Sequence, residues 1–558
     1  MPDTSPTGVS FSARAEQIFP VLTPEQIERI APHGERRRVA AGEVLVEPGQ
    51  ERVRVFVVES GEIEVLQPAG GREQLVTVHH AGQFSGDVNM LSGRPGFLRL
   101  RARTDSDLIE IDRDSLLALV QTDSELSDII MRAFILRRVE VIAQEIGNVV
   151  LIGSRHAPGT LRIKEFLTRN GYPYSSIDLD RDRGVQELLD RFRVAITDIP
   201  VLICNGRIVL RNPSNQEIAD CLGFNVAIDP TQVRDVVIVG AGPAGLAAAV
   251  YASSEGLDVL VLEGEAPGGQ AGASSKIENY LGFPTGISGR DLAARAYNQA
   301  QKFGTQVLIA KRATQLACVK RPYAVEVDDG TRIPARTVVI ATGAEYRRIG
   351  IENLPQFEGR GIYYGATFIE AQLCRDDEVV VVGGGNSAGQ AAVFLAQTAK
   401  RVYMLVRSGG LAESMSRYLI RRIEQSPAIE LRTHTEVVAL DGDDHLQCIR
   451  WRNNQAGATE TRDIRHVFLM TGAEPSTGWL HGCLTLDAKG FIKTGPDLTR
   501  EELAAARWPL ARAPYLLETS LPGVFAVGDV RSENIKRVAS AVGEGSIAIS
   551  FVHRVLSE

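Results

Sequence analysis

Closely spaced cysteine pairs are what this sequence most clearly lacks. Its 558 residues contain six cysteines, at Cys204, Cys221, Cys318, Cys374, Cys448 and Cys483. No two of them form a C-x-x-C. Disulfide frameworks and structural zinc sites are recognised by cysteines at short, regular spacings. The sequence therefore predicts neither a disulfide framework nor a metal site.

Long apolar runs and an excess of basic charge are also absent. No stretch of about 18 consecutive apolar residues occurs, and the first residues, Met-Pro-Asp-Thr-Ser-Pro-Thr, do not form a basic region followed by an apolar core. The formal net charge is −8, whereas nucleic acids and anionic membranes bind positively charged surfaces. We therefore expect a cytoplasmic protein with no nucleic acid and no membrane among its partners.

The length and composition are those of a modular globular protein. At roughly 100 to 200 residues per domain, the chain is long enough for three to five domains. The apolar fraction of 44 % and the charged fraction of 23 % are ordinary for soluble domains. The 53 glycines are numerous enough to suggest nucleotide-binding loops.

Short strands separated by glycine turns fill residues 11–123, a pattern typical of a β-barrel or jelly roll. A helix is expected next, over residues 126–146. Three runs resemble the cyclic-nucleotide-binding domain family: Gly42-Glu-Val-Leu, Phe56-Val-Val-Glu-Ser-Gly-Glu-Ile-Glu-Val and Gly82-Gln-Phe-Ser-Gly-Asp-Val-Asn-Met-Leu-Ser-Gly. The resemblance implies a ligand whose phosphate is held by backbone amides and an arginine, and whose ribose is held by a glutamate.

Two of these ligand-binding positions depart from the family pattern. Asp87 stands at the glutamate position, and Gly96-Phe97 stands where an arginine and an alanine should be. Without a guanidinium, the cost of burying a phosphate would not be offset. Three alternatives follow: Arg94 or Arg99 substitutes and a nucleotide-like ligand binds, the barrel is structural, or the barrel holds another kind of ligand.

Residues 148–226 have a β-α-β-α-β-β-α pattern, with helices expected at 160–170 and 185–192 and a turn at Asn205-Gly206. With Thr197-Asp-Ile-Pro200 before a strand, this order resembles the thioredoxin or glutaredoxin fold. The resemblance implies a cis-proline at Pro200 and a redox pair at Ala157-Pro158-Gly159-Thr160. Both sulfurs are missing there, so we expect a docking or spacer role. Cys204 is expected in the core and His156 on the surface.

An apolar strand, a glycine turn and a helix follow one another in Asp235-Val-Val-Ile-Val-Gly240-Ala-Gly242-Pro-Ala-Gly245-Leu. Glycines allow a tight turn and close backbone approach, and the helix N-terminus offers amides to a pyrophosphate. About 20 residues further on, Glu263 ends the second strand, where a carboxylate suits the ribose hydroxyls. These features together predict a dinucleotide site.

A second copy of the motif occurs in Glu378-Val-Val-Val-Val-Gly383-Gly-Gly385-Asn-Ser-Ala388. Its second strand ends in Arg407 rather than in an acid. An arginine at this place favours a 2′-phosphate over a free ribose hydroxyl. We therefore expect a second dinucleotide, and NADPH rather than NADH.

The C-terminal half resembles the low-molecular-weight thioredoxin reductases, in residues 268–284, 339–344, 468–475 and 522–530. The resemblance implies that FAD occupies the first site, with Gln270 and Asn279 near the flavin, Asp529 on the ribityl chain and the amides near Val538 at the ring. The motif and the resemblance together indicate FAD contacts at Gly240, Gly242, Ala244, Gly245, Glu263, Gly269, Gln270, Asn279, Thr342, Gly343, Gly528, Asp529, Arg537, Val538 and Ala539. The NADPH contacts expected are Gly383, Gly385, Asn386, Ser387, Ala388 and Arg407.

The chain departs from this family at the redox dithiol. The family's C-x-x-C aligns with Gly365-Ala366-Thr367-Phe368, so Gly365 and Phe368 occupy the cysteine positions and no catalytic cysteine is expected. Cys374 is six positions beyond Phe368 and is interpreted as structural. A dithiol relay of the family type therefore cannot operate.

Three functions remain open. The first is an NADPH-dependent FAD oxidoreductase that passes electrons from the flavin to a small oxidant, a partner's disulfide or a thioredoxin-like or ferredoxin-like protein, in the manner of a ferredoxin–NADP reductase. The second is a redox sensor read by the N-terminal modules. The third is a disulfide reductase that uses cysteines distant in sequence. We favour the first, as a homodimer like the family.

The fold predicted is multidomain: a jelly-roll barrel, an α/β thioredoxin-like domain and two α/β Rossmann-like domains. The boundaries expected are 10–146 for the barrel with its trailing helix, 148–226 for the thioredoxin-like domain, 232–353 and 475–558 for the FAD domain, and 354–474 for the NADPH domain.

Overall fold

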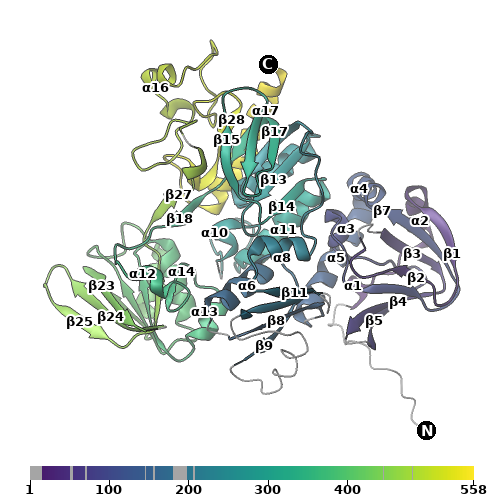
Figure 1. Cartoon of the computed structure of the whole chain (residues 1–558), viewed down its shortest axis with the longest axis horizontal. Helices are drawn as coiled ribbons and strands as arrows, with labels where there is room; N and C mark the ends of the chain where they lie inside the picture. Colours follow the sequence, from purple (N-terminus) through teal and green to yellow (C-terminus); the bar gives the residue numbers. More distant parts are fainter. Residues whose placement is uncertain are drawn as a thin grey trace, which may run out of the picture.

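The structure, a computed structural model, describes residues 15–558 except 51–53, 70–71, 145, 155–156, 180–197, 205–207, 275, 444 and 481. Along these residues a barrel is followed by a four-stranded sheet, a seven-stranded sheet and a five-stranded sheet (Figure 1). The seven-stranded sheet is completed by β28 (Val524–Ala526), which comes after the five-stranded sheet in sequence. The multidomain fold class expected from the sequence is confirmed.

The barrel consists of two antiparallel sheets with strand orders β1-β7-β3 and β2-β6-β4-β5. Alternate residues of β3 face two different cores, because Val55 and Val57 pack with one apolar cluster while Phe56 and Val58 pack with another. The strands are β1 (Glu35–Val39), β2 (Val44–Val46), β3 (Arg54–Ser60), β4 (Glu62–Ala69), β5 (Arg72–His80), β6 (Arg99–Ala102) and β7 (Ser106–Asp112).

Helices close one end of the barrel and connect it to the next unit. The long helix expected from the sequence is α5 (Ser124–Ala143), and Asp123 caps its first turn by accepting from the Leu126 amide at 3.0 Å. Its neighbour α4 (Arg113–Thr122) was not expected. Three short helices complete this part: α1 (Ala15–Ile18), α2 (Pro24–Ile30) and α3 (Asn89–Ser92).

The four-stranded sheet has the order β11-β10-β8-β9. Its elements are β8 (Val149–Gly153), α6 (Pro158–Arg169), β9 (Ser175–Asp178), β10 (Val201–Cys204), β11 (Ile208–Arg211) and α8 (Asn215–Cys221). The peptide bond before Pro200 is cis and Cys204 is fully buried, as expected. The helix expected at 185–192, the turn at Asn205-Gly206 and His156 lie outside the described residues.

The seven-stranded sheet has a parallel part that carries the first glycine motif. Its order is β14-β13-β12-β17-β16-β15, with β28 pairing β17. The strands are β12 (Arg234–Val239), β13 (Val259–Glu263), β14 (Gln306–Ile309), β15 (Ala313–Ala317), β16 (Tyr323–Val327) and β17 (Arg332–Ile340). Helices α9 (Pro243–Ser254) and α17 (Val538–Ser557) pack against each other and against this sheet. The parallel strands β12 and β13 contribute residues to the apolar clusters on both faces of the sheet and are almost continuously apolar.

The five-stranded sheet is parallel and carries the second glycine motif, in the order β19-β26-β20-β21-β22. Its strands are β19 (Ile362–Tyr363), β20 (Glu378–Val382), β21 (Arg401–Leu405), β22 (Ile429–Arg432) and β26 (His466–Leu469). A three-stranded sheet of β23 (Thr435–Gly442), β24 (Leu446–Asn453) and β25 (Thr459–Arg462) covers it. The chain enters and leaves through β18 (Ala344–Tyr346) and β27 (Ala473–Pro475), which pair with each other.

The cysteine spacings predicted no disulfide framework, but the structure contains one disulfide between cysteines that are far apart in sequence. Cys318 and Cys483 are bonded, with their Cα atoms 6.0 Å apart and 165 residues between them in sequence. Cys318 follows β15, and Cys483 follows the short helix η3 (Gly478–Leu480) that packs against that strand. Spacing in the sequence cannot reveal this pair, because only the packing of two distant segments brings the sulfurs together.

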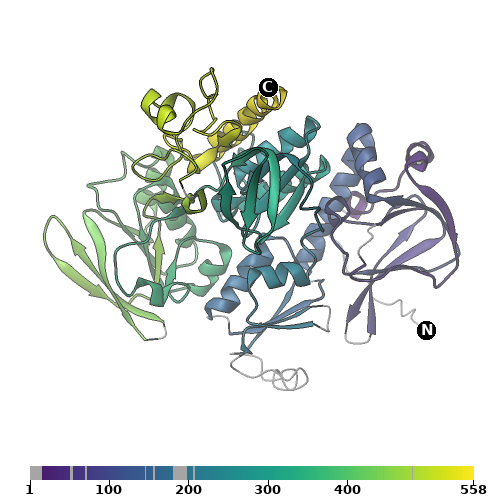
Figure 2. The same ribbon diagram turned by 45° about the horizontal axis from the view of Figure 1, so that its top comes forward.

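The four-stranded sheet lies between the barrel and the five-stranded sheet in both ribbon views (Figures 1 and 2). On the side of this sheet that is away from the barrel, α6 lies beside the segment that leads to β19, and a Cβ placed on Gly359 would be 3.3 Å from the Cβ of Pro158.

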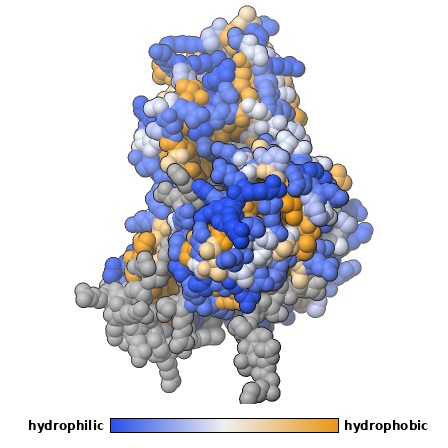
Figure 3. Space-filling model, turned by 90° about the vertical axis from the view of Figure 1, so that its right-hand side faces the viewer, coloured by the Kyte–Doolittle hydropathy of each residue, from blue (hydrophilic) through white to orange (hydrophobic). Residues whose placement is uncertain are grey.

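Seen from the barrel side, the described surface is mainly polar with scattered apolar patches (Figure 3). No helix among the described residues is both long and apolar enough to cross a membrane.

Candidate dinucleotide-binding sites

The first glycine turn, between β12 and α9, is shaped by contacts with protein atoms. Gly240 has a φ of +105°, and a Cβ there would lie 2.4 Å from the carbonyl oxygen of Ala341. A Cβ on Gly245 would lie 1.8 Å from the carbonyl oxygen of Gly240. At Gly242, the N-cap of α9, a Cβ would meet no protein atom closer than 3.9 Å. The first and third glycines are therefore required by the fold, while the second leaves the helix N-terminus open to a ligand.

Glu263 lies beside this turn at the carboxyl end of β13. One carboxylate oxygen accepts from the Ala241 amide at 2.7 Å, and the other accepts from the Glu265 amide at 2.9 Å. Burial raises the pKa of Glu263, and the two amide hydrogen bonds lower it in part. Sequence reasoning placed this carboxylate correctly at the end of the strand, but its two amide donors become visible only in the fold.

A second loop approaches the glycine turn from the side. Gly269 begins α10 (Gly269–Gly272), and a Cβ on it would be 3.1 Å from the Cα of Gly242. Gln270 and Asn279 are exposed along the same loop. On the other side, the Thr342 hydroxyl donates to the Ser476 carbonyl at 3.0 Å, next to Gly343 with its φ of +66°. The structure therefore gathers residues from four distant segments around one turn.

Asp529 lies in the short helix η5 (Gly528–Val530), and burial raises its pKa. The preceding amide, on Gly528, donates to Glu544 at 2.7 Å, and Glu544 also pairs with Arg531 at 2.7 Å. Gly528 packs on α9, where a Cβ would be 3.0 Å from that of Ala244. Glu544 was missed from the sequence, because nothing in its local pattern shows that it positions a turn 16 residues earlier.

The start of α17 presents unpaired backbone amides. Its N-cap residue, Arg537, makes no capping hydrogen bond through its side chain, and Ala539 is exposed. Because the first amides of a helix have no partner within the helix, Val538 and Ala539 offer donors to a ligand. Lys536, just before this helix, donates to the Asp529 carbonyl at 3.2 Å, so the helix start lies near Asp529.

The second glycine turn, between β20 and α14 (Asn386–Leu395), repeats the geometry of the first. At Gly383 a Cβ would lie 2.3 Å from the carbonyl oxygen of Met470, and at Gly385 it would meet nothing within 4 Å. The side-chain Oδ1 of Asn386 accepts from the Ser416 amide at 2.8 Å. Ala388 is buried in α14. Arg407 is exposed just beyond the end of β21, at the same edge of the sheet.

Tyr346, in β18, lies near both turns. Burial raises its pKa, the hydrogen bond to Ser387 of the second turn lowers it in part, and the negative charge of Asp529 in the first site raises it further. Beside them, Arg422 from α15 (Arg417–Gln425) pairs with Glu278 at 2.6 Å. Tyr346 and the Arg422–Glu278 pair thus link the two halves, and neither was foreseen from the sequence.

No sulfur stands at the positions where the family dithiol would be. Thr367 caps α13 (Phe368–Leu373), and its amide donates to Glu370 at 2.8 Å. Phe368 is 68 % exposed at the start of this helix, and no atom lies within 4 Å of the Cβ position of Gly365. Cys374 is buried, its thiol donates to the Glu370 carbonyl, and burial raises its pKa to about 12. It is structural, as expected.

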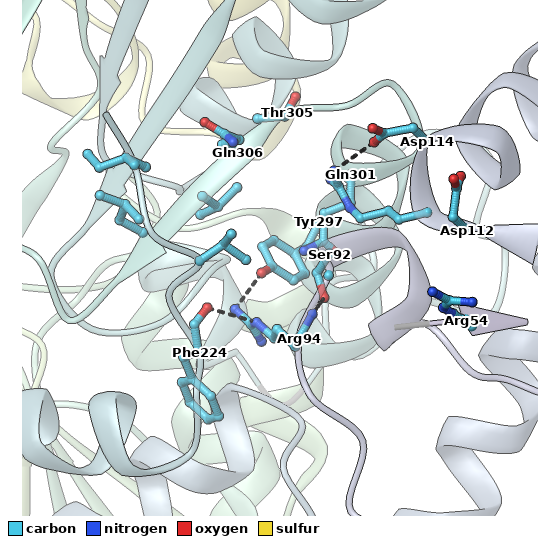
Figure 4. Close-up of a pocket in the computed structure, with 16 residues that line it drawn as sticks. Arg54, Ser92, Arg94, Asp112, Asp114, Phe224, Tyr297, Gln301, Thr305 and Gln306 are labelled. Carbon is cyan, nitrogen blue, oxygen red and sulfur yellow. Dashed lines mark hydrogen bonds and ion pairs between the residues drawn. The ribbon is translucent and has the colours of Figure 1, made fainter. Parts of the chain in front are cut away.

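The arginines considered for the barrel ligand point elsewhere. Arg94 donates to the Phe224 carbonyl at 3.0 Å and to the Tyr297 hydroxyl at 2.6 Å, and so joins the barrel to α11 (Gly289–Lys302) across an interdomain cavity of about 410 Å³ (Figure 4). Arg99 pairs with Glu47 at 2.8 Å and with Glu73. Neither lines the cavity inside the barrel. The structure therefore does not support the alternative in which one of them replaces the missing phosphate-binding arginine.

Two open glycine turns at the edges of parallel sheets define a protein that binds two dinucleotides. Residues 234–545 match the family described as pyridine nucleotide-disulphide oxidoreductase, and the chain belongs to this family. Residues 36–123 match the cyclic nucleotide-binding domain. The protein is therefore an oxidoreductase and a flavoprotein of the thioredoxin reductase-like type, with a cyclic-nucleotide-binding-like barrel before it.

Named relatives agree with this assignment. The chain is 33 % identical over 325 residues to a thioredoxin reductase of Mycoplasma pneumoniae, across 58 % of this chain and 96 % of the relative. Its structure resembles Lactococcus lactis thioredoxin reductase in the FR conformation, with a TM-score of 0.52 and 26 % identity over 58 % of this chain and 99 % of the other. The thioredoxin reductase of T. acidophilum gives a TM-score of 0.51 and 28 % identity over the same shares of the two chains.

The cofactors of such reductases are FAD and NADPH, and the residues present fit them. At Gly242 and Gly385 the space beside the helix N-terminus is free of protein atoms to nearly 4 Å, which suits a pyrophosphate at each place. Glu263 in the first site can accept from ribose hydroxyls, and Arg407 in the second can meet a 2′-phosphate.

Proposed function

We propose that this chain is an NADPH-dependent FAD oxidoreductase that moves a hydride from NADPH to FAD and passes the electrons on without a dithiol relay. Bound FAD would supply the redox chemistry, and the protein supplies binding, orientation and access. The observation that carries the proposal is the pair of open glycine turns, with Tyr346 near a residue of each site, in a chain with no cysteine at positions 365 and 368.

Each of the sequence-selected residues has a role in this proposal. Gly242 and Gly269 border the FAD pyrophosphate, Glu263 accepts from the adenosine ribose, and Asp529 accepts from the ribityl chain. The amides of Val538 and Ala539 are donors to the flavin ring, because they stand free at the start of a 20-residue helix. Gln270, Asn279 and Thr342 surround the same space.

In the second site, Gly385 and the first amides of α14 hold the NADPH pyrophosphate, and Arg407 contacts the 2′-phosphate. A guanidinium on a phosphate is a charge-assisted contact that NADH cannot make. Ser387 is tied to Tyr346, so the nicotinamide half is held toward the FAD half during hydride transfer. The domain boundaries expected from the sequence, with the NADPH domain inserted between two parts of the FAD domain, belong to the same proposal.

The acceptor must reach the reduced flavin itself. With Gly365 and Phe368 in place of a dithiol, no side chain there can take up electrons and present them at the surface. A partner's disulfide, a ferredoxin-like or thioredoxin-like protein, or a small oxidant can each meet this condition.

Rapid anaerobic mixing tests the proposal. Purified protein that contains flavin should lose its main visible absorbance quickly when mixed with NADPH, and more slowly with NADH at the same concentration. Acceptors can then be tested for reoxidation of the bleached protein. A spectrum that remains oxidised over minutes would contradict the hydride step.

That negative result would favour the second function, a redox sensor read by the N-terminal modules. One observation supports it: Arg94 bonds the barrel both to Phe224, after the four-stranded sheet, and to Tyr297 in α11. A state of the FAD half could therefore be communicated to the barrel through α11.

A further inference from the structure

The barrel encloses a cavity of about 110 Å³ that none of the dinucleotide chemistry uses. Its walls are mainly apolar and include Val65, Val76, Phe97, Leu100 and Val141. Typical pockets for drug-sized ligands are about 300 Å³ or larger. The cavity is therefore too small for a whole nucleotide in this form, and its walls suit a short apolar group.

A buried guanidinium stands at one side of this cavity. Arg137, from α5, is only 7 % exposed. It donates to the carbonyl oxygens of Ile18 and Gly86, each at 2.9 Å, while its Nη2 is buried without a hydrogen-bond partner. The guanidinium carbon lies 4.7 Å from the ring centre of Phe84 and 5.3 Å from that of Phe19, so the group is held firmly between two rings.

The positive charge of Arg137 has no carboxylate paired with it among the described residues. Asp87 is the nearest acid and raises the pKa of Arg137, but its ion pair is with Arg138 at 3.4 Å. Burial outweighs this effect and lowers the pKa of Arg137 to about 9, so the group is still charged at neutral pH. A buried charge without a partner is costly, and an anion inside the cavity would remove much of that cost.

A second unpartnered polar atom lies in the same wall. His79 is 2 % exposed, and its Nδ1 is buried with no hydrogen-bond partner. Burial and the nearby charge of Arg137 lower its pKa, so the ring is neutral. A neutral imidazole can donate to or accept from an oxygen of a ligand, depending on its tautomer.

We propose that the barrel cavity binds a small organic carboxylate, with the carboxylate on Arg137 and His79 and an apolar or aromatic body against Val65, Val76, Phe97, Leu100 and Val141. The site differs from the cyclic-nucleotide arrangement in two respects. The arginine comes from α5 rather than from the segment after α3, and Gly96 and Phe97 stand where the resemblance to that family puts an arginine and an alanine.

Isothermal titration of the full-length holoprotein with sodium benzoate and with benzamide tests the proposal. These two probes have the same ring and differ in charge. Benzoate should bind at least about tenfold more tightly than benzamide, because a hydrogen bond to a charged partner is lost in the amide. Equal affinity for both, or no benzoate binding, would overturn the proposal, and so would binding of cyclic AMP or inorganic phosphate in preference to benzoate.

Variants then place the site. Arg137→Gln should abolish benzoate binding, while Arg132→Gln, an exposed arginine on the same helix that pairs with Asp128 at 2.8 Å, should leave it unchanged. Val76→Phe, which fills the cavity and keeps Arg137, should also prevent binding.

Circular dichroism and flavin content check that each variant is folded. If Arg137→Gln does not fold, Val76→Phe and the benzoate–benzamide comparison in the unmodified protein still decide the question. Retained binding in a folded Arg137→Gln or Val76→Phe variant would show that benzoate binds elsewhere.

Discussion

The two glycine turns of this chain share the close contact at their first glycine but differ in how tightly the rest of the turn is packed. In both, a Cβ on the first glycine would approach a carbonyl oxygen of the neighbouring strand's end, at 2.4 Å for Gly240 and at 2.3 Å for Gly383. They differ one helical turn later. Gly245 is so close to the carbonyl oxygen of Gly240 that no side chain fits, whereas the second copy has Ala388 at the corresponding place, fully buried.

The turns also differ at the end of their second strands. In the first copy Glu263 is partly buried and accepts from two amides, while in the second copy Arg407 is exposed. The first turn is therefore more tightly packed against protein atoms than the second, although the space beside Gly242 is open in the same way as that beside Gly385. We expect the first site to retain its cofactor and the second to exchange its coenzyme. The same motif can therefore suit two different dinucleotides through differences at two positions, Gly245 against Ala388 and Glu263 against Arg407.

The largest effect is expected from Gly245→Ala. A Cβ 1.8 Å from a backbone oxygen forces the turn open, at a cost of about 3 kcal/mol or more. The variant should be purified largely without flavin and should melt at a lower temperature, as absorbance and calorimetry can show. Ala388→Gly in the second copy is the matched control and should cost only about 1 kcal/mol. Equal loss of flavin in both variants would refute the contrast.

Gly242→Ala separates folding from cofactor binding in the first site. The new methyl would meet no protein atom within 3.9 Å, and the φ of −70° is allowed for alanine. The melting temperature of the flavin-free protein should therefore be unchanged, while the FAD dissociation constant should rise by about tenfold or more because the methyl blocks close approach of the pyrophosphate. Unchanged FAD affinity would show that the pyrophosphate does not lie there.

Arg407→Ala tests the second site. Loss of a charge-assisted contact to the 2′-phosphate should raise KM for NADPH by about tenfold and leave KM for NADH and both kcat values nearly unchanged. Steady-state kinetics with an artificial acceptor measures all four values. Arg401→Ala, which removes another exposed arginine of the same strand that pairs with Glu430 at 2.8 Å, should have no such effect.

Glu263→Gln should change how FAD affinity depends on pH. If ribose hydroxyls donate to Glu263, FAD favours the ionised carboxylate, so affinity should rise as pH rises through the pKa that burial has raised. The glutamine variant should bind FAD about fivefold more weakly at high pH and should lack this rise. Fluorescence titration from pH 5 to about pH 8 follows both proteins. Glu265→Gln, whose carboxylate is 55 % exposed, should retain the pH dependence.

The smallest effect is expected from the ion pair that joins the two halves. Arg422 and Glu278 are 2.6 Å apart, but the arginine side chain is 48 % exposed. Such pairs contribute about 0.2–1 kcal/mol. Arg422→Ala should therefore alter the rate of flavin reduction by NADPH by less than about fivefold, and salt should reduce the difference. A larger, salt-independent change would mean that the pair controls how the two halves are oriented.

Much of the fold was predictable because its signals are local. The strand-turn-helix order around Gly240 and Gly383 follows from residues within a dozen positions of each other, whereas the cis-proline before Cys204 was implied by the resemblance to the thioredoxin fold. Helix α4 was not predicted, because residues 113–122 were assigned to the strand-rich segment that comes before α5. For the candidate sites, the glycines and the strand-end residues were identified, but Tyr346 and Glu544 were not.

Sequence alone determined which nucleotide motifs the chain carries, that it has two of them and that no C-x-x-C accompanies them. These depend on residue type and short spacing, which the backbone geometry of a turn fixes locally. Only the tertiary structure decided that Cys318 is bonded to Cys483, that Arg94 of the barrel donates to Tyr297 of α11, and that Arg137 Nη2 has no hydrogen-bond partner among the described residues. The first two contacts join segments that are far apart in the chain. The third depends on which groups surround a buried charge, and the packing of the chain determines this.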